Sequence, residues 1–229
     1  MSLVIQNFFR PFADFDLRAD FEVGNQERVA LLGASGCGKT SILRAIAGIG
    51  DSRLESGSIQ LLGEEISRVP SEKREVGLVF QDFALFPSLD VWGNLIFGLQ
   101  ARGVPREEWD SRLARWVDRF ALRPLMKASV LQLSGGEKQR VALVRTLVTQ
   151  PKVLLLDEPF SALDAVLREE AARAVREVQE LLQVPLVFVT HDPGDVERLA
   201  TRVLRLNAVC NPPGRRCHFF DAQSYQPQG

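Results

Sequence analysis

The chain has 229 residues, of which 45% are hydrophobic and 25% charged, which is enough for one large domain with a sizeable core. A formal net charge of −1 gives no overall field that would draw the protein to nucleic acid or to an anionic membrane surface. The N-terminus MSLVIQNFFR lacks the basic start and apolar run of a signal peptide, and no apolar stretch approaches the roughly 20 residues of a membrane span. We therefore expect a chain that does not itself cross a bilayer, and an odd number of cysteines favours a reducing compartment.

The first part of the chain predicts strands. Residues 2–32 alternate apolar and polar positions in places and carry many phenylalanines, which indicates antiparallel strands. Glu27–Leu32 reads ERVALL and predicts a buried strand that leads into a glycine-rich loop.

That loop, Gly33–Thr40, reads GASGCGKT and fits the phosphate-loop pattern G-x-x-x-x-G-K-[ST]. Its glycines let the backbone curl so that successive N–H groups face an anion. We expect Lys39 to reach the β- and γ-phosphates of a nucleotide and the Thr40 hydroxyl to ligate Mg²⁺. The alternative is a glycine-rich turn without a ligand. The residues expected to line the nucleotide are Gly33, Ala34, Ser35, Gly36, Cys37, Gly38, Lys39, Thr40 and Ser41.

The middle of the chain changes character. A helix is predicted over Thr40–Ala47, and strands over Gly57–Leu62 and Glu75–Phe80, the latter ending at Gln81. From residue 82 no strand pattern occurs, and Arg106–Leu122 carries apolar residues on one helical face. We expect a helical subdomain at about 82–133, inserted into an α/β core.

The second half alternates helices and strands. Helices are expected from Ser134 to about Gln150 and over Ala165–Gln183, and strands over Lys152–Asp157, Leu186–Thr190 and Arg202–Leu206. This alternation predicts an α/β fold with a mostly parallel sheet. We expect one domain over residues 1–206 and a polar surface tail over 207–229.

Polar residues follow several predicted strands. Gly33, Gln81, Asp157, Glu158 and His191 all lie just beyond strand ends, where open α/β sheets bind ligands. Two adjacent carboxylates buried after a core strand are costly unless a cation or a proton compensates them, and the alternative is two acids in a solvated strand-end loop. We expect Asp157 to hold Mg²⁺ and Glu158 to polarise an attacking water.

Gln81 and His191 each have two interpretations from the residues alone. Gln81 could coordinate Mg²⁺ or the attacking water, and His191 could donate to the γ-phosphate. A purely structural role is the alternative for both.

The segment Ser134–Glu137 is also open to two interpretations. Ser-x-x-Glu is the pattern of a helix capping box. However, Gly135 and Gly136 in a first helical turn lower helix stability, and bare N–H groups at a helix start suit an anion. A second phosphate-facing surface is therefore predicted here.

These residues carry a family resemblance. LSGGEKQR at Leu133–Arg140 resembles the signature motif of ABC-type ATPases, and it lies between GASGCGKT and VLLLDEP in that family's order. Gln81 in VFQDFALFP looks like the Q-loop, Ser161–Asp164 like the D-loop, and His191 in VTHD like the switch histidine. The resemblance extends over nearly the whole chain and implies a P-loop NTPase core that binds and hydrolyses ATP with Mg²⁺. The catalytic residues it implies are Lys39, Gln81, Glu158 and His191.

The resemblance also implies partners. In this family two ATPase subunits face each other head to tail, as a homodimer or a heterodimer. Ser134, Gly135, Gly136, Glu137 and Asp164 would then act at the partner's nucleotide. The cycle drives integral membrane permease subunits on separate chains, with docking expected on the exposed face near Phe83–Val91. The family stacks adenine on an upstream aromatic residue, and Phe12 is the candidate here.

The segment FQDFALFP, followed by VWGNLIFGL, most resembles the corresponding sequence of bacterial importer ATPases. Such a subunit would lie at the cytoplasmic face of the inner membrane, in a transporter that also has a solute-binding protein as a partner. Many of them carry an extra C-terminal β-rich regulatory domain, which we expect this chain to lack. The alternatives are an exporter ATPase and a soluble ABC-type ATPase without a transport role, and no contact with nucleic acid is expected. The transported substrate is not indicated.

Overall fold

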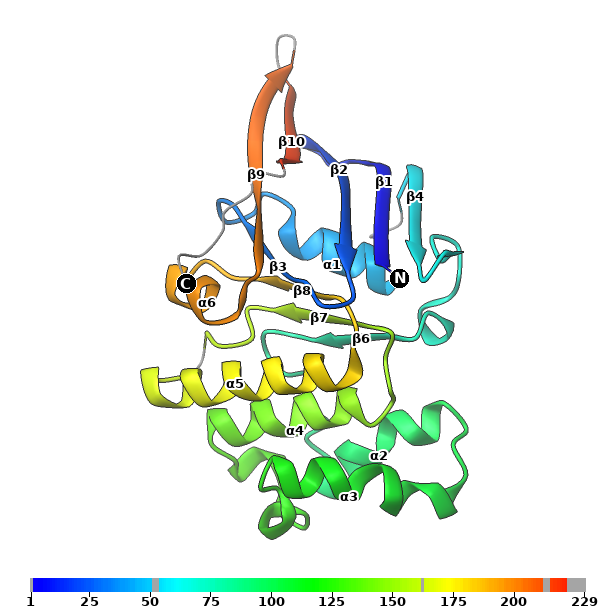
Figure 1. Ribbon diagram of the computed structural model, residues 1–229, viewed down its shortest axis with the longest axis vertical. Helices are drawn as coiled ribbons and strands as arrows, with labels where there is room; N and C mark the ends of the chain where they lie inside the picture. Colours follow the sequence, from blue (N-terminus) through cyan, green and yellow to red (C-terminus); the bar gives the residue numbers. More distant parts are fainter. Residues whose placement is uncertain (1, 51–53, 162, 212–214, 222–229) are drawn as a thin grey trace.

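A ten-stranded sheet forms the centre of the computed structural model (Figure 1). The structure describes residues 2–50, 54–161, 163–211 and 215–221, and it describes side chains as far as Leu206. The strand order across the sheet is β5-β4-β1-β2-β10-β9-β3-β8-β7-β6. The strands are β1 (Ser2–Pro11), β2 (Phe15–Gly24), β3 (Arg28–Leu32), β4 (Ser56–Leu61), β5 (Glu64–Glu65), β6 (Val76–Val79), β7 (Val153–Asp157), β8 (Leu186–Val189), β9 (Arg202–Asn211) and β10 (Arg215–Asp221).

One half of the sheet is parallel and the other is antiparallel. Strands β9, β3, β8, β7 and β6 pair in parallel, whereas β2, β1, β4 and β5 pair antiparallel. All residues of β7 and β8 are buried, as expected for parallel strands covered on both faces. The predicted fold class, an α/β protein with a mostly parallel sheet and antiparallel N-terminal strands, is confirmed.

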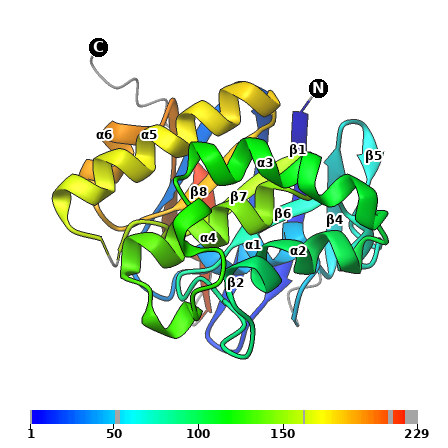
Figure 2. The ribbon, with the colours of Figure 1, turned by 90° about the horizontal axis from the view of Figure 1, so that it is seen from below.

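Helices cover both faces of the parallel strands. The helices are α1 (Lys39–Ala47), α2 (Val91–Ala101), α3 (Trp109–Arg119), α4 (Gly135–Leu147), α5 (Ala165–Leu182) and α6 (Pro193–Leu199). Helix α1 lies between the parallel strands and the antiparallel strands, and α2 to α5 lie on the opposite side (Figure 1). Viewed from below, α2 to α5 cover strands β6, β7 and β8 (Figure 2).

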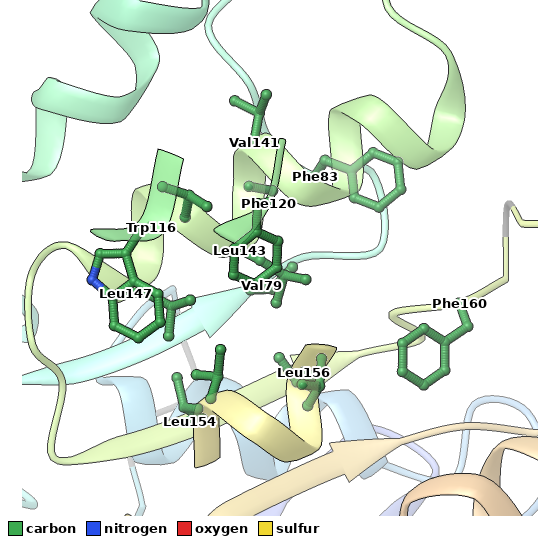
Figure 3. Close-up of a cluster of buried hydrophobic side chains, with 14 of the residues drawn as sticks. Val79, Phe83, Trp116, Phe120, Val141, Leu143, Leu147, Leu154, Leu156 and Phe160 are labelled. Carbon is green, nitrogen blue, oxygen red and sulfur yellow. The ribbon is translucent and has the colours of Figure 1, made fainter. Parts of the chain in front are cut away.

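The parallel strands supply side chains to two separate cores. In β7, Leu154 and Leu156 pack into the cluster with α2 to α6, whereas Val153 and Leu155 pack into the cluster with α1. This division follows from the two-residue repeat of a strand, which sends successive side chains to opposite faces. Figure 3 shows the first cluster, where Trp116 and Phe120 lie near Leu154 and Leu156.

The segment between β6 and α4 contains only helices and turns, apart from an isolated bridge between Asp90 and Ser129. Helix α3 matches the predicted amphipathic helix, and its Trp116 is core. Helix α2 was not predicted, because its apolar residues surround the helix and Gly93 and Gly98 interrupt it. Its start is fixed by Asp90, whose carboxylate accepts a hydrogen bond from the Gly93 N–H at 2.7 Å.

The prediction of an irregular tail from Asn207 is wrong for residues 207–211 and 215–221. Strand β9 continues to Asn211, and β10 pairs antiparallel with β9 and parallel with β2. Backbone hydrogen bonds to two neighbouring strands hold this segment, and apolar periodicity carries no signal for such pairing. Within the described residues, no helix has both the length and the apolar composition that a membrane span requires.

Helix α1 ends against a buried arginine. Arg74 is 5% exposed, and its guanidinium donates to the carbonyls of Ala45 and Ile46 at 2.7 and 3.0 Å, and also to those of Ser67 and Val69. A cation at a helix C-terminus satisfies carbonyls that have no partner within the helix. Arg74 thus ties the helix that follows the phosphate loop to the segment leading into β6.

We expect the Arg74→Met variant to lower the free energy of unfolding by about 2–4 kcal/mol, because buried carbonyls then lose a charged donor. Chemical denaturation with guanidinium chloride measures the change. The control is Arg68→Met, which removes an exposed guanidinium from the same segment and is expected to be nearly neutral. Equal losses in both variants would contradict this role of Arg74.

Candidate active site

Four strand ends form one edge of the parallel sheet. Strands β3, β8, β7 and β6 are neighbours in that order, and all run in the same direction. Their C-terminal ends therefore present the Gly33–Thr40 loop, His191, the Asp157–Glu158 pair and Gln81 along a single line. The arrangement unites segments that lie more than one hundred residues apart in the chain.

The Gly33–Thr40 loop curls around its own lysine. Gly36 and Gly38 have φ values of 75° and 107°, the left-handed region that glycine adopts without strain. Lys39 is 8% exposed, and its ammonium donates to the carbonyls of Gly33 and Ala34 at 2.9 and 2.8 Å. An added Cβ at Gly33 would lie 2.8 Å from Cys37 Sγ and 3.0 Å from Leu206 Cβ, so a larger residue there would force these side chains or the loop to shift.

Thr40 and Asp157 bring two oxygen atoms together. The Thr40 hydroxyl donates to Asp157 Oδ1 at 3.0 Å, which joins the start of α1 to the end of β7. Burial raises the pKa of Asp157, and the nearby Glu158 charge adds to this effect, whereas the Thr40 hydrogen bond acts in the opposite direction. A hydroxyl and a buried carboxylate are oxygen ligands of the kind that Mg²⁺ prefers, so these residues fit a divalent cation.

Glu158 and His191 form a pair beside this cation-type site. The carboxylate of Glu158 contacts His191 Nδ1 at 2.6 and 2.8 Å through its two oxygens. This hydrogen bond raises the pKa of His191, since it favours the charged imidazolium. The Glu158 side chain is 16% exposed and that of His191 is 71% exposed, so the pair reaches from the sheet edge into solvent.

The backbone at Glu158 has an unusual conformation. Its φ is 50°, in the left-handed region that residues other than glycine rarely adopt. The Glu158 N–H nevertheless donates to Val189 O at 2.9 Å and continues the ladder between β7 and β8. The turn therefore directs successive side chains differently, and Asp157 contacts Thr40 while Glu158 contacts His191.

An ionic network behind His191 was not found by the sequence analysis. Arg168 of α5 forms an ion pair with Asp192 and donates to Leu163 O at 3.3 Å. Thr190 donates to the buried Asp195 at 2.9 Å, which fixes the turn on the other side of His191. Nothing in the sequence distinguishes Arg168 from the other arginines of α5.

Gln81 and Phe12 lie outside these contacts. Gln81 is exposed in the turn after β6. Phe12 is half-buried in the turn between β1 and β2, where its ring stacks on Phe15 with centroids 4.7 Å apart. The guanidinium carbon of Arg10 lies 5.0 Å from the Phe12 ring centroid.

The Ser134–Glu137 segment forms the capping box at the start of α4. The Glu137 N–H donates to Ser134 Oγ at 3.3 Å, and the Ser134 N–H donates to the Glu137 carboxylate at 2.8 Å. This second contact lowers the pKa of Glu137. Asp164 similarly caps α5 by accepting from Val166 and Leu167, whereas Ala162 in the same segment lies outside the described residues.

Comparison with known proteins connects this geometry to a family. The family model described as "ABC transporter" matches residues 17–161. The chain is 42% identical over 193 residues to the spermidine/putrescine import ATP-binding protein PotA of Haemophilus influenzae. The matched region covers 84% of this chain and 50% of that protein. It is 43% identical over 214 residues to the sulfate/thiosulfate import ATP-binding protein CysA of Methylococcus capsulatus, which covers 91% of this chain and 61% of that protein.

A third relative is the Fe(3+) ions import ATP-binding protein FbpC of Streptomyces avermitilis, 43% identical over 189 residues, covering 82% of this chain and 54% of that protein. The chain thus spans about half to three-fifths of the length of these relatives. A solved structure titled "Structure of ATP binding subunit of ABC transporter" has the same fold, with a TM-score of 0.77 at 22% identity over 90% of this chain and 85% of that one. Since the family model covers more than half of the sequence, the chain belongs to the ABC transporter family.

Proposed function

We propose that this chain is the ATP-binding and ATP-hydrolysing subunit of a membrane importer. The observation that carries the proposal is the meeting of the Gly33–Thr40 loop, the Thr40–Asp157 pair and the Glu158–His191 pair at one edge of the sheet. These three groups provide a phosphate cradle, a cation site and an acid–base pair. The relatives named above are all import ATP-binding proteins, which favours import over export.

Each group has a proposed task toward ATP and Mg²⁺. The backbone N–H groups of the loop and the Lys39 ammonium bind the phosphates, with Ala34, Ser35 and Ser41 on the same loop and helix start. Thr40 and Asp157 hold Mg²⁺, together with Gln81. The bound cation supplies charge neutralisation at the phosphates, and the protein supplies position.

Glu158 is proposed as the general base. Its carboxylate accepts the proton of a water, and its contact with His191 keeps it oriented toward the phosphate side of the edge. His191, which carries a raised pKa, is proposed to donate to the γ-phosphate. Phe12 is proposed to stack on the adenine, through the ring that now lies beside Arg10 and Phe15.

The start of α4 is proposed to serve the other subunit of a dimer. Ser134, Gly135 and Gly136 lie at a helix N-terminus, whose dipole favours an anion, and no described contact joins them to the phosphate loop of the same chain. A head-to-tail partner would bring its own nucleotide to them, with Glu137 and Asp164 fixing the two helix starts. The dimer can be a homodimer or a heterodimer.

The remaining partners are permease subunits in the membrane and a solute-binding protein, with this chain at the cytoplasmic face. We propose that residues 82–133 form the helical subdomain of an ATPase domain over 1–206, and that the segment near Phe83–Val91 contacts the permease. Relatives of nearly equal identity are named for polyamines, sulfate and Fe(3+). We therefore propose that the membrane and solute-binding subunits determine which substrate is transported.

The Glu158→Gln variant is expected to reduce ATP hydrolysis at least about 100-fold, because the amide cannot accept a proton from water. ATP binding is expected to persist, and the ATP-bound dimer to accumulate. Phosphate release and binding of a fluorescent ATP analogue measure the two effects. Glu180→Gln, on an exposed stretch of α5, is the matched control and should retain full turnover. Undiminished hydrolysis by Glu158→Gln would exclude Glu158 as the base.

The Glu158–His191 pair predicts a pH effect. The pairing with Glu158 raises the pKa of His191. The contribution of this pair to the stability of the folded protein is therefore fully present below the ordinary imidazole pKa of about 6.5, and it is lost as the pH rises through the raised pKa. In an NMR titration, the Glu158→Gln variant should return the His191 pKa toward its ordinary value. His191→Gln identifies the resonance. An identical titration in both proteins would contradict the pairing.

A mixing experiment tests the shared site. Gly135→Asp places a carboxylate where it favours the helix but repels a partner's phosphates, and Lys39→Ala disables the phosphate loop. Each variant alone should be inactive. Random mixing should restore about a quarter of the wild-type activity. Half of the dimers then contain one subunit of each variant, and each of these has one intact site of two. A mixture without activity would contradict the head-to-tail arrangement.

A further inference from the structure

The loop that follows Gln81 has a demanding backbone. Phe83 and Ala84 are consecutive residues with φ values of 62° and 44°, in the left-handed region. Neither is glycine, so each Cβ strains the turn. Asp82 contributes one restraint, because its carboxylate accepts from the Ala84 N–H at 3.2 Å.

Arg145 of α4 holds the carbonyls of both strained residues. Its Nη1 donates to Ala84 O at 2.6 Å and its Nη2 donates to Phe83 O at 2.7 Å. The guanidinium carbon also lies 5.5 Å from the centroid of the Phe86 ring. The planar guanidinium binds the two carbonyls through separate nitrogens while it lies beside the Phe86 ring, and a lysine ammonium, which has no planar fork, cannot reproduce this combination.

The rest of the loop is held from α2. Asn94 is fully buried, and its side chain accepts from the Phe86 N–H at 2.8 Å and donates to Phe86 O at 3.1 Å. The loop is therefore fixed at Phe83–Ala84 by α4 and at Phe86 by α2. Phe83 belongs to the same buried cluster as Val141 and Leu143 of α4 (Figure 3).

Helix α4 connects this clamp to the capping box. It begins at Gly135, directly after Ser134, and Arg145 lies three turns later. At 1.5 Å of rise per residue, the clamp and the capping box are about 16 Å apart along one rigid helix. Any displacement of the Gln81 loop that keeps the Arg145 contacts must carry the start of α4 with it.

We propose that Arg145 is a positioning residue that couples Gln81 of one nucleotide site to Ser134–Gly136, which serve the other. The proposal deepens the proposed function and rests on it. Arg145 acts through other residues, by keeping the left-handed Phe83–Ala84 turn attached to α4. Through Arg145, nucleotide binding at one site changes the position of Ser134–Gly136 at the opposite site of the dimer.

The test measures ATP hydrolysis by the transporter assembly that contains Arg145→Lys. We expect kcat to fall about tenfold while KM for ATP stays within about twofold, because the phosphate loop is unchanged and only the placement of catalytic groups is lost. The control is Arg102→Lys, which removes a single guanidinium contact, to Thr149 O at 2.7 Å, from an exposed arginine in the same helical region. Equal losses in kcat for the two variants would overturn the proposal.

A second variant separates attachment to α4 from relief of backbone strain. Adding Ala84→Gly to Arg145→Lys should leave kcat low, because glycine relaxes the left-handed turn but does not reattach it to α4. Gln150→Gly is the matched control, since Gln150 also has a positive φ of 51° but lies beyond α4. Recovery of kcat by Ala84→Gly but not by Gln150→Gly would assign the effect to strain in the turn alone and overturn the proposal.

Amide hydrogen exchange gives a readout that does not depend on turnover. In Arg145→Lys, exchange should rise both at Phe83–Leu85 and at Glu137, whereas a change confined to Phe83–Leu85 would overturn the coupling. If the wild-type assembly hydrolyses no ATP, the proposed function fails, and the exchange pattern alone then decides the role of Arg145.

Discussion

Parallel pairing of β3, β8, β7 and β6 is the constraint on which the site depends. Because these strands point the same way, their following loops must emerge together, and no loop needs to fold back to reach the others. The pairing is in turn enforced by burial on both faces, since β7 and β8 expose no residue to solvent. The hydrophobic packing of two cores thus determines where the Thr40–Asp157 pair and the Glu158–His191 pair lie.

Charge burial and backbone strain are concentrated at one dipeptide. Asp157 is nearly buried and its neighbour Glu158 has a left-handed backbone, and both conditions are unfavourable by themselves. They are stabilised by Thr40, by His191 and by the backbone of β8, which come from three different segments. The dipeptide is consequently a point where α1, β7 and the turn after β8 are held to each other.

The fold class and the parallel strands could be predicted because apolar runs such as 153–156 and glycine-rich motifs have local signatures. Helix α2 and strand β10 could not, because the first is apolar on all sides and the second is held by backbone pairing with β2 and β9. The motif residues were also identifiable from spacing. Arg74, Arg145 and Arg168 were not, because an arginine whose guanidinium binds distant carbonyls or carboxylates has the same local pattern as a solvated one.

The enclosed ammonium of Lys39 has a consequence for affinity. The carbonyls of Gly33 and Ala34 already satisfy this charge, so the loop contains an internal competitor for any incoming phosphate. Binding strength is then set by an exchange of hydrogen bonds, in which only the difference between old and new partners counts. Under the proposed function, such an exchange would keep the loop ordered between turnovers and limit how tightly the product nucleotide is retained.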